Sequence, residues 1–203
     1  MRRFLPCLVL SLALSTPVLA QPDGQSVDGP VPASKTPAWL PRGAFLGTFL
    51  NEGVVLPQAQ LQWEIPFYQT RNDGLYLIFE GGGGLSVATP DKALPFTEAV
   101  LDSVSLYTVM GGAGYRNQRP GGWHWGFHVV TGPAFYGARF LTSTPQEDYF
   151  VGFLEGRAQV GHSVGPFVLG AAVGYGSSYN YRRRSVARPY VGGLQVGLFA
   201  DWQ

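Results

Sequence analysis

The feature that most constrains this chain is the alternation of apolar and polar residues over long stretches. In residues 58–69 every second position carries an apolar side chain, namely Ala59, Leu61, Trp63, Ile65 and Phe67. The positions between them hold mostly Gln, Glu and Tyr. Because successive side chains of a β-strand point to opposite faces, this stretch predicts a strand with one apolar and one polar face.

Runs of this kind follow one another along most of the chain, separated by clusters of turn-forming residues. Eight can be marked, at residues 38–50, 58–69, 75–87, 104–117, 123–141, 148–161, 166–179 and 189–202. In the first run the alternation is weak, and in the fourth both sets of alternate residues around Val104 are apolar, so the faces of these two stay unassigned. No segment after residue 37 has clear helical periodicity, and the fold class is therefore all-β.

The lengths of the runs and of their connections favour a membrane barrel over a soluble sandwich. The runs exceed the ~5–6 residues usual in soluble sheets and reach the ~9–11 residues that a tilted strand needs to cross a bilayer. Short periplasmic turns and longer outer loops are typical of outer-membrane barrels. The short connections here are 70–74, 118–122 and 162–165. The connections that alternate with them are 51–57, 88–103, 142–147 and 180–188, and most of these are longer.

A sheet that spans a membrane must close, because an unpaired backbone group in hydrocarbon is too costly to leave at an edge. We therefore predict that residues 38–203 form a closed antiparallel up-and-down transmembrane β-barrel of about eight strands. Aromatic residues near both ends of the runs would form the girdles at the two membrane interfaces. They include Phe67, Trp123 and Phe167 at the periplasmic end, and Tyr136 and Tyr190 at the opposite end. A bore of this size is filled by side chains, so we expect a monomer without an open pore.

The N-terminal residues predict export. Arg2 and Arg3 precede an apolar core of about 11 residues and a small-residue cleavage site that ends at Ala20. Such a core is too short for a spanning helix, which needs ~20 residues. Residues 1–20 are therefore predicted to be a cleaved signal peptide. Residues 21–37, which are rich in Pro, Gly, Ser and Asp, are predicted to be a disordered periplasmic leader.

Composition excludes several classes of function. The single cysteine, Cys7, lies in the predicted signal, so the processed chain has no thiol for a disulfide or a Cys-ligated metal. Without Arg2 and Arg3, 12 basic residues face 13 acidic ones, a net charge of −1, and no nucleic-acid partner is indicated. We expect no cofactor and no metal.

The last run, residues 194–202 (LQVGLFADW), alternates regularly and ends in an aromatic residue. With the strand pattern of residues 38–203, it resembles the small OmpA/OmpX-type barrels of the Gram-negative outer membrane. The resemblance implies that the barrel-insertion machinery reads this strand during assembly, and that the protein contacts membrane lipid and lipopolysaccharide. It also implies a structural or surface-interaction role without enzymatic activity.

Charged residues on the predicted inner face are the first candidates for a functional site. They are Glu64, Glu80, Glu155 and Arg157, with Arg42 and Arg116 as possible further members. Buried charges need partners, so we interpret this set as an ion-pair network that plugs the bore. A gated ion path through a narrow channel, or an acid/base pair, is the alternative interpretation.

A lipid-modifying enzyme of the lipid A deacylase or esterase type is the second alternative. His162 lies next to Ser163, but adjacent residues of a strand point to opposite faces and no third residue is evident to orient the histidine.

His124 and His128 share a face but are about 13 Å apart on a strand, and so do not form a metal pair by themselves. The glycine run 81–84 lacks the lysine and the helix of a phosphate-binding loop, and predicts close packing within a strand.

The densest positive cluster lies in the predicted outer connection after the seventh run. It consists of Arg182, Arg183, Arg184 and Arg188. Arginine binds phosphate through paired hydrogen bonds, so these residues are candidates for contact with lipopolysaccharide phosphates. An ordinary solvated loop is the alternative.

Overall fold

The computed structural model describes residues 39–94, 98–119, 121–142, 145–179 and 185–202. The predicted signal peptide and leader lie outside the described residues.

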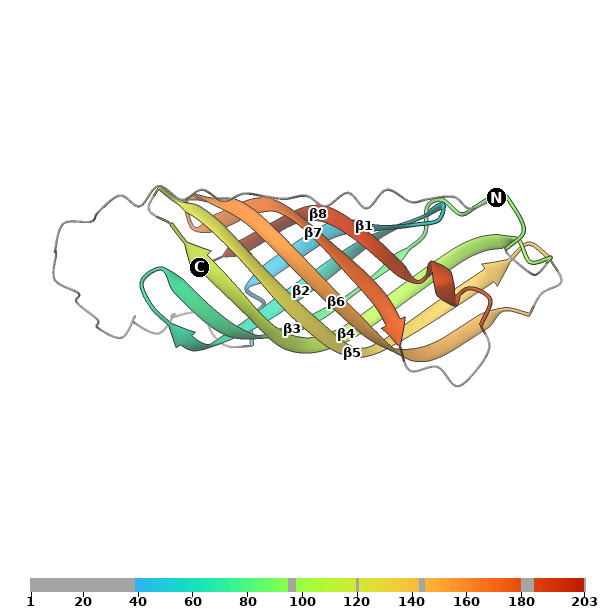
Figure 1. The fold of residues 1–203 in the computed structure, drawn as a ribbon, viewed down its shortest axis with the longest axis horizontal. Coiled ribbons are helices and arrows are strands. Elements are labelled where there is room, and N and C mark those ends of the chain that lie inside the picture. The colour runs from blue at the N-terminus through green and yellow to red at the C-terminus, as the bar shows by residue number, and fades with distance from the viewer. Residues whose placement is uncertain (1–38, 95–97, 120, 143–144, 180–184, 203) are drawn as a thin grey trace, which may run out of the picture.

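The described residues form eight strands, each antiparallel to the next, and the last pairs with the first (Figure 1). The strands are β1 (Gly43–Asn51), β2 (Val54–Gln69), β3 (Asp73–Leu85), β4 (Leu101–Gln118), β5 (Trp123–Phe140), β6 (Glu147–Val164), β7 (Phe167–Tyr179) and β8 (Gly192–Trp202). Gly43 of β1 lies opposite Asp201 of β8, so the barrel begins and ends at the same rim. The predicted closed up-and-down barrel is confirmed, and so is the fold implied by the resemblance to small OmpA/OmpX-type barrels.

The first connection is shorter than predicted. Asn51 pairs with Val54, which leaves a two-residue turn at Glu52 and Gly53 in place of the loop expected at 51–57. Both turn residues have positive φ angles, 45° and 93°, as a tight hairpin turn requires. The predicted loop ended at Pro57, a type of residue that commonly interrupts strands, and this prediction was wrong. Pro57 lies inside β2, and the pairing of β2 with β3 begins only at the next residue.

The two strands whose faces the sequence left open are resolved by the structure. In β1, Phe45 and Phe49 are buried inside the barrel, and Leu46 is exposed outside. In β4, alternate residues from Val104 to Met110 are buried inside, while Tyr107 and Val109 are exposed. Both sets are apolar in β4 because its inner face joins a hydrophobic core that fills this end of the barrel.

The outer surface of the barrel is apolar on every strand. Each strand exposes at least one large apolar side chain, for example Leu46, Leu61, Leu77, Val109, Phe127, Leu154, Val173 and Leu198. Soluble proteins rarely expose continuous apolar surface of this extent, whereas a spanning barrel presents such a band to lipid. The chain is therefore a barrel of the bacterial outer membrane, as predicted.

Among the described residues, no helix is long and apolar enough to cross a membrane.

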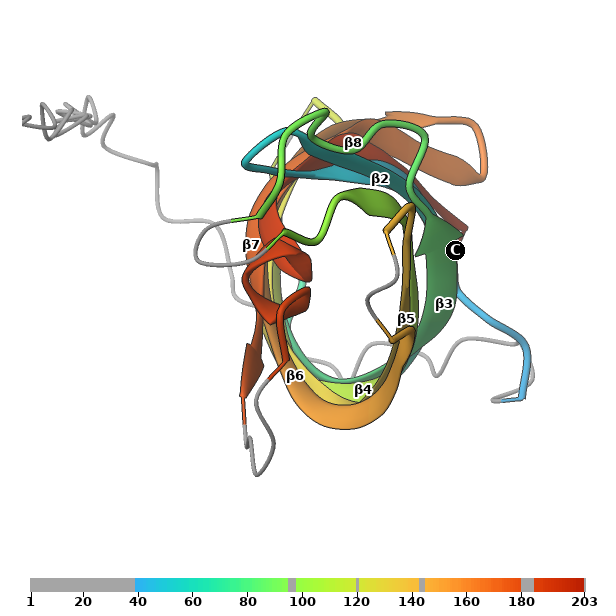
Figure 2. The same ribbon diagram turned by 90° about the vertical axis from the view of Figure 1, so that its right-hand side faces the viewer.

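The aromatic residues only partly follow the predicted girdles. At the rim with the short turns, Phe67, Trp123 and Phe167 are exposed as expected. At the opposite rim, Tyr136 and Tyr190 were expected to face the membrane interface, but both are buried inside the barrel. Tyr190 belongs to the short 3-10 helix η1 (Arg188–Tyr190), which lies on the inner side of the ring in Figure 2.

Glycines on the inner face of β3 allow β2 to approach closely. A Cβ atom on Gly84 would lie 2.1 Å from the carbonyl oxygen of Pro57, and one on Gly82 would lie 2.3 Å from that of Ala59. A Cβ atom on Gly81, of the same run, would meet no atom within 4 Å. The glycine run is therefore a packing feature of the barrel wall.

We predict that Gly84→Ala lowers the stability of the barrel by about 1–3 kcal/mol, because the added methyl group forces the wall apart. Gly81→Ala is the matched control, and its effect should be small or slightly stabilising. The measurement is the urea midpoint of unfolding of the barrel in detergent micelles. Equal midpoints for the two variants would show that β2 and β3 are not packed as described.

Candidate functional site in the barrel interior

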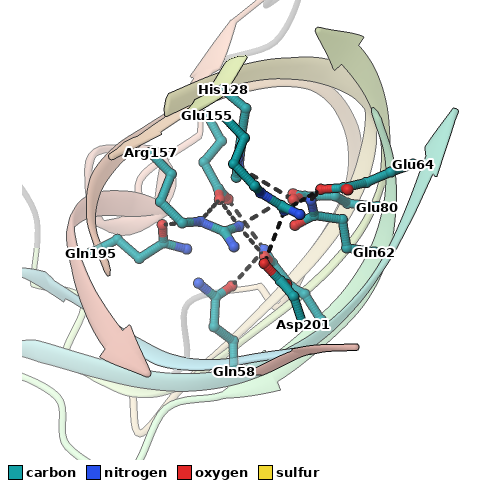
Figure 3. A network of polar contacts seen from close by, with 11 residues as sticks. Gln58, Gln62, Glu64, Glu80, His128, Glu155, Arg157, Gln195 and Asp201 are labelled. Carbon is teal, nitrogen blue, oxygen red and sulfur yellow. Dashed lines mark hydrogen bonds and ion pairs between the residues drawn. The ribbon is translucent and has the colours of Figure 1, made fainter. Parts of the chain in front are cut away.

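The interior of the barrel has two layers. Near η1, side chains from the strands and from the connections that follow β3 and β7 form an apolar core, which includes Leu94, Leu101, Tyr136, Phe153 and Tyr190. Toward the middle, the inward residues become polar and charged (Figure 3). Both layers come from the same period of two, because each strand sends every second side chain inward.

The polar layer is built largely from β2, β3, β6 and β8. The polar inward residues of β2 are Gln58, Gln60, Gln62 and Glu64, as the alternation predicted. Facing glycines leave room for the long interior side chains, and a Cβ atom on Gly82 would lie 2.6 Å from Cγ of Gln60. A Cβ atom on Gly174 would lie 2.9 Å from Oε1 of Gln195, and one on Gly114 would lie 2.8 Å from Cβ of His128.

Arg157 is the centre of one ion-pair cluster. Its guanidinium donates to Glu155 Oε1, with an Nε–O distance of 3.1 Å, and to Glu80 Oε2 at 3.2 Å. It also donates to Gln60 Oε1 and, at 3.2 Å, to Gln195 Oε1. The ring of Phe45 lies beneath it, with its centroid 4.0 Å from Cζ. These contacts join β1, β2, β3, β6 and β8 across the bore.

Arg116 is the centre of a second cluster, nearer the rim with the short turns. Its Nη2 lies 2.6 Å from Glu64 Oε1 and 2.9 Å from Asp201 Oδ2. Gln62 Nε2 donates to the same Glu64 oxygen at 2.7 Å. The guanidinium also lies over the ring of Tyr76, 5.5 Å from its centroid. Each of the two arginines therefore faces two carboxylates.

His128 projects from β5 between the two clusters. Its Nε2 lies 3.2 Å from Glu80 Oε1. The angles at this contact are not those of a hydrogen bond, and neither atom has a hydrogen-bond partner among the described residues. A cavity of about 10 Å³, large enough for about one water molecule, lies beside His128 and is lined also by Glu64 and Arg116.

The structure thus places the predicted interior residues in two groups. Glu80, Glu155 and Arg157 are together in one cluster, while Glu64 pairs with Arg116 in the other. Sequence analysis missed Asp201, although the alternation of the last run places it on the same face as Gln195. It also missed His128 as a member of the interior polar set, because contacts across a bore depend on strand register rather than on sequence spacing.

The side chains of the adjacent residues His162 and Ser163 form hydrogen bonds with different partners. His162 Nε2 lies 3.0 Å from the carbonyl oxygen of Gly121. Ser163 Oγ instead lies 2.7 Å from Nε2 of His124, on the inner face. The other ring nitrogen of His124 is buried without a hydrogen-bond partner in the described structure, so the group that would orient a catalytic histidine is missing there.

The outer rim carries the other candidate surface. Arg182, Arg183 and Arg184 lie outside the described residues, and Arg188 is the first residue of η1. A cavity of about 290 Å³ lies between β7, β8 and η1, and its lining includes Arg188, Asn51, Tyr175, Ser178 and Val191. Glu147 holds the chain before η1, accepting hydrogen bonds from Ser185 Oγ at 2.6 Å and from the backbone N–H of Val186 at 2.8 Å.

Comparisons with known proteins add little to this description. No family model matches the sequence, and no curated protein matches it. Among solved structures, the chain is similar to Ail, the attachment invasion locus protein of Yersinia pestis, with a TM-score of 0.39 and 13% sequence identity. The similarity covers 78% of this chain and 90% of that one.

We predict that Arg157→Ala destabilises the barrel by about 3–5 kcal/mol, because it leaves Glu80 and Glu155 buried without their cation. Arg139→Ala is the matched control. Arg139 pairs with Asp148 at 3.1 Å, but both side chains are more than 40% exposed, and exposed pairs contribute under about 1 kcal/mol. The urea midpoints of the two variants in detergent micelles provide the measurement. Equal shifts would mean that water fills the bore around Arg157.

Proposed function

We propose that the protein is a closed outer-membrane barrel with a structural or surface-interaction role, and that its interior side chains plug the bore. The observation that carries this proposal is the arginine cluster described above, in which one guanidinium contacts side chains of five strands. We further propose that the barrel is monomeric and is inserted by the outer-membrane assembly machinery, as its alternating last strand suggests.

The burial of the interior side chains argues against a channel. Glu80, Glu155 and Arg157 are at most 3% exposed. An ion that passed through would have to separate these charges from one another, which leaves each of them uncompensated in a medium of low dielectric constant. Beyond them toward η1 lies the apolar layer, which includes Leu101 and Phe153, and these side chains offer no ligands to a dehydrated ion.

The arrangement around Ser163 argues against a lipid-modifying enzyme. A serine nucleophile needs a base that is itself held in place by a third group. His124 could serve as the base, but its Nδ1 has no such partner in the described residues. His124 is also only 3% exposed and faces the interior, where a lipid in the surrounding membrane does not reach it.

The outer rim is where we propose that the protein meets its surroundings. Lipopolysaccharide would contact the arginines at positions 182–184 and Arg188, because guanidinium groups bind phosphate through paired hydrogen bonds. The cavity beside Arg188 offers a polar recess at that rim. The exposed ion pair between Arg139, at the end of β5, and Asp148, at the start of β6, lies at the same rim.

We predict that the purified barrel shows no resolved conductance steps in a planar lipid bilayer, because the proposed plug of charged and apolar side chains would block the passage of ions. A general porin, reconstituted in the same way, is the positive control. Steady steps comparable to those of the porin would overturn the proposal in favour of a channel. Release of fatty acid from lipid A, lost in Ser163→Ala, would overturn it in favour of the enzyme.

A further inference from the structure

Three interior side chains lie close enough together to hold a metal ion. Glu80, His128 and Glu155 each offer a ligand atom, and these atoms all lie within 4.8 Å of one another. The residues come from β3, β5 and β6, and Figure 3 shows their side chains reaching into the bore. All three are at least 97% buried. From this geometry we propose that they bind one divalent metal ion, such as zinc.

The distance between two of the ligand atoms fits such an ion. Zinc holds nitrogen and oxygen ligands at about 2.0–2.1 Å in a tetrahedron, which places any two of them about 3.3 Å apart. His128 Nε2 and Glu80 Oε1 are 3.2 Å apart. Neither atom has a hydrogen-bond partner in the described structure, although both are buried. A cation between them would satisfy both lone pairs at once.

The charge of the cluster also calls for a cation. Arg157 is one positive charge facing two carboxylates, those of Glu80 and Glu155. The neighbouring Arg116 is already paired with Glu64 and Asp201. Together the two clusters hold two arginines and four carboxylates, a net charge of −2 when all are ionised. A divalent ion would balance this charge, and buried charge without compensation is costly.

The surrounding side chains would hold the ligands in position. Arg157 donates to Glu80 Oε2 at 3.2 Å, which leaves Oε1 of that carboxylate directed at His128. Gln60 Nε2 donates to Glu155 Oε2, also at 3.2 Å. Such outer contacts orient the ligands of metal sites and tune their affinity. One imidazole with two carboxylates, and no thiolate, suits zinc and related ions better than calcium or magnesium, which prefer oxygen ligands alone.

This proposal departs from the sequence-based expectation that the protein holds no metal. That expectation rested on the absence of a thiol from the processed chain and on the separation of His124 and His128, about 13 Å along one strand. The structure instead brings His128 together with carboxylates from two other strands. The site does not depend on the proposed role of the barrel, since a bound ion would stabilise a plugged barrel and would equally occupy a narrow channel.

The test measures metal content directly. The protein is expressed from its full-length gene, purified from outer membranes without a histidine tag, stripped by unfolding in urea with a chelator, and refolded with Zn²⁺ present throughout. Refolding in the presence of the ion makes access through the closed barrel unnecessary. After removal of free metal, we expect one zinc per barrel, and with Co²⁺ in its place the visible absorption of a tetrahedral N/O site.

Two histidine variants decide whether the ion lies where we propose. His128→Ala should lose the bound zinc, whereas His124→Ala, four residues along the same inner face, should keep it. If His128→Ala does not refold, His128→Gln, which keeps the volume and polarity of the side chain, takes its place. A wild-type barrel that refolds without retaining zinc would overturn the proposal, as would equal zinc content in the two variants.

Discussion

Closure of the sheet is the constraint on which the rest of this structure depends. In hydrocarbon every backbone N–H and C=O must find a partner within the protein, and the pairing of β1 with β8 removes the last two free edges. Once the ring is closed, every strand has one face toward lipid and one toward the bore. The alternation of side chains then serves two environments at once, and this explains the low content of charged residues, 13% of the chain.

The interior must solve a different problem. We propose that the long inward side chains of this eight-stranded ring leave too little space for a water column. The charges placed there therefore have to compensate one another, and they do so around two arginines. The inward glycines, such as Gly114 and Gly174, make room for the imidazole and amide groups opposite them. Charge balance and wall packing are thus parts of one arrangement, and the proposed metal ion would complete it.

Sequence reasoning recovered the features that depend on local pattern. The strand count, the antiparallel order and the inner face of β2 all follow from a period of two, and all are confirmed. Features set by contacts between distant strands were harder to predict. Tyr136 and Tyr190 look like girdle residues, but they fill the bore because this end of the interior is apolar. Similarly, Ser163 pairs with His124 rather than with its neighbour, because the register of β5 and β6 decides it.

The most direct test of closure is a disulfide across the seam. Leu46 of β1 and Leu198 of β8 are register partners, and both are exposed on the outer surface. Directly opposed strand residues have Cβ atoms about 4.5–5.5 Å apart, close to the span of a disulfide. In a Cys7→Ser background, oxidation should cross-link the Leu46→Cys/Leu198→Cys variant. It should not cross-link Leu46→Cys/Leu194→Cys, whose second site is four residues, or about 13 Å, further along β8. No cross-link in the first variant, or equal yields in both, would contradict a barrel closed by β1 and β8 in this register.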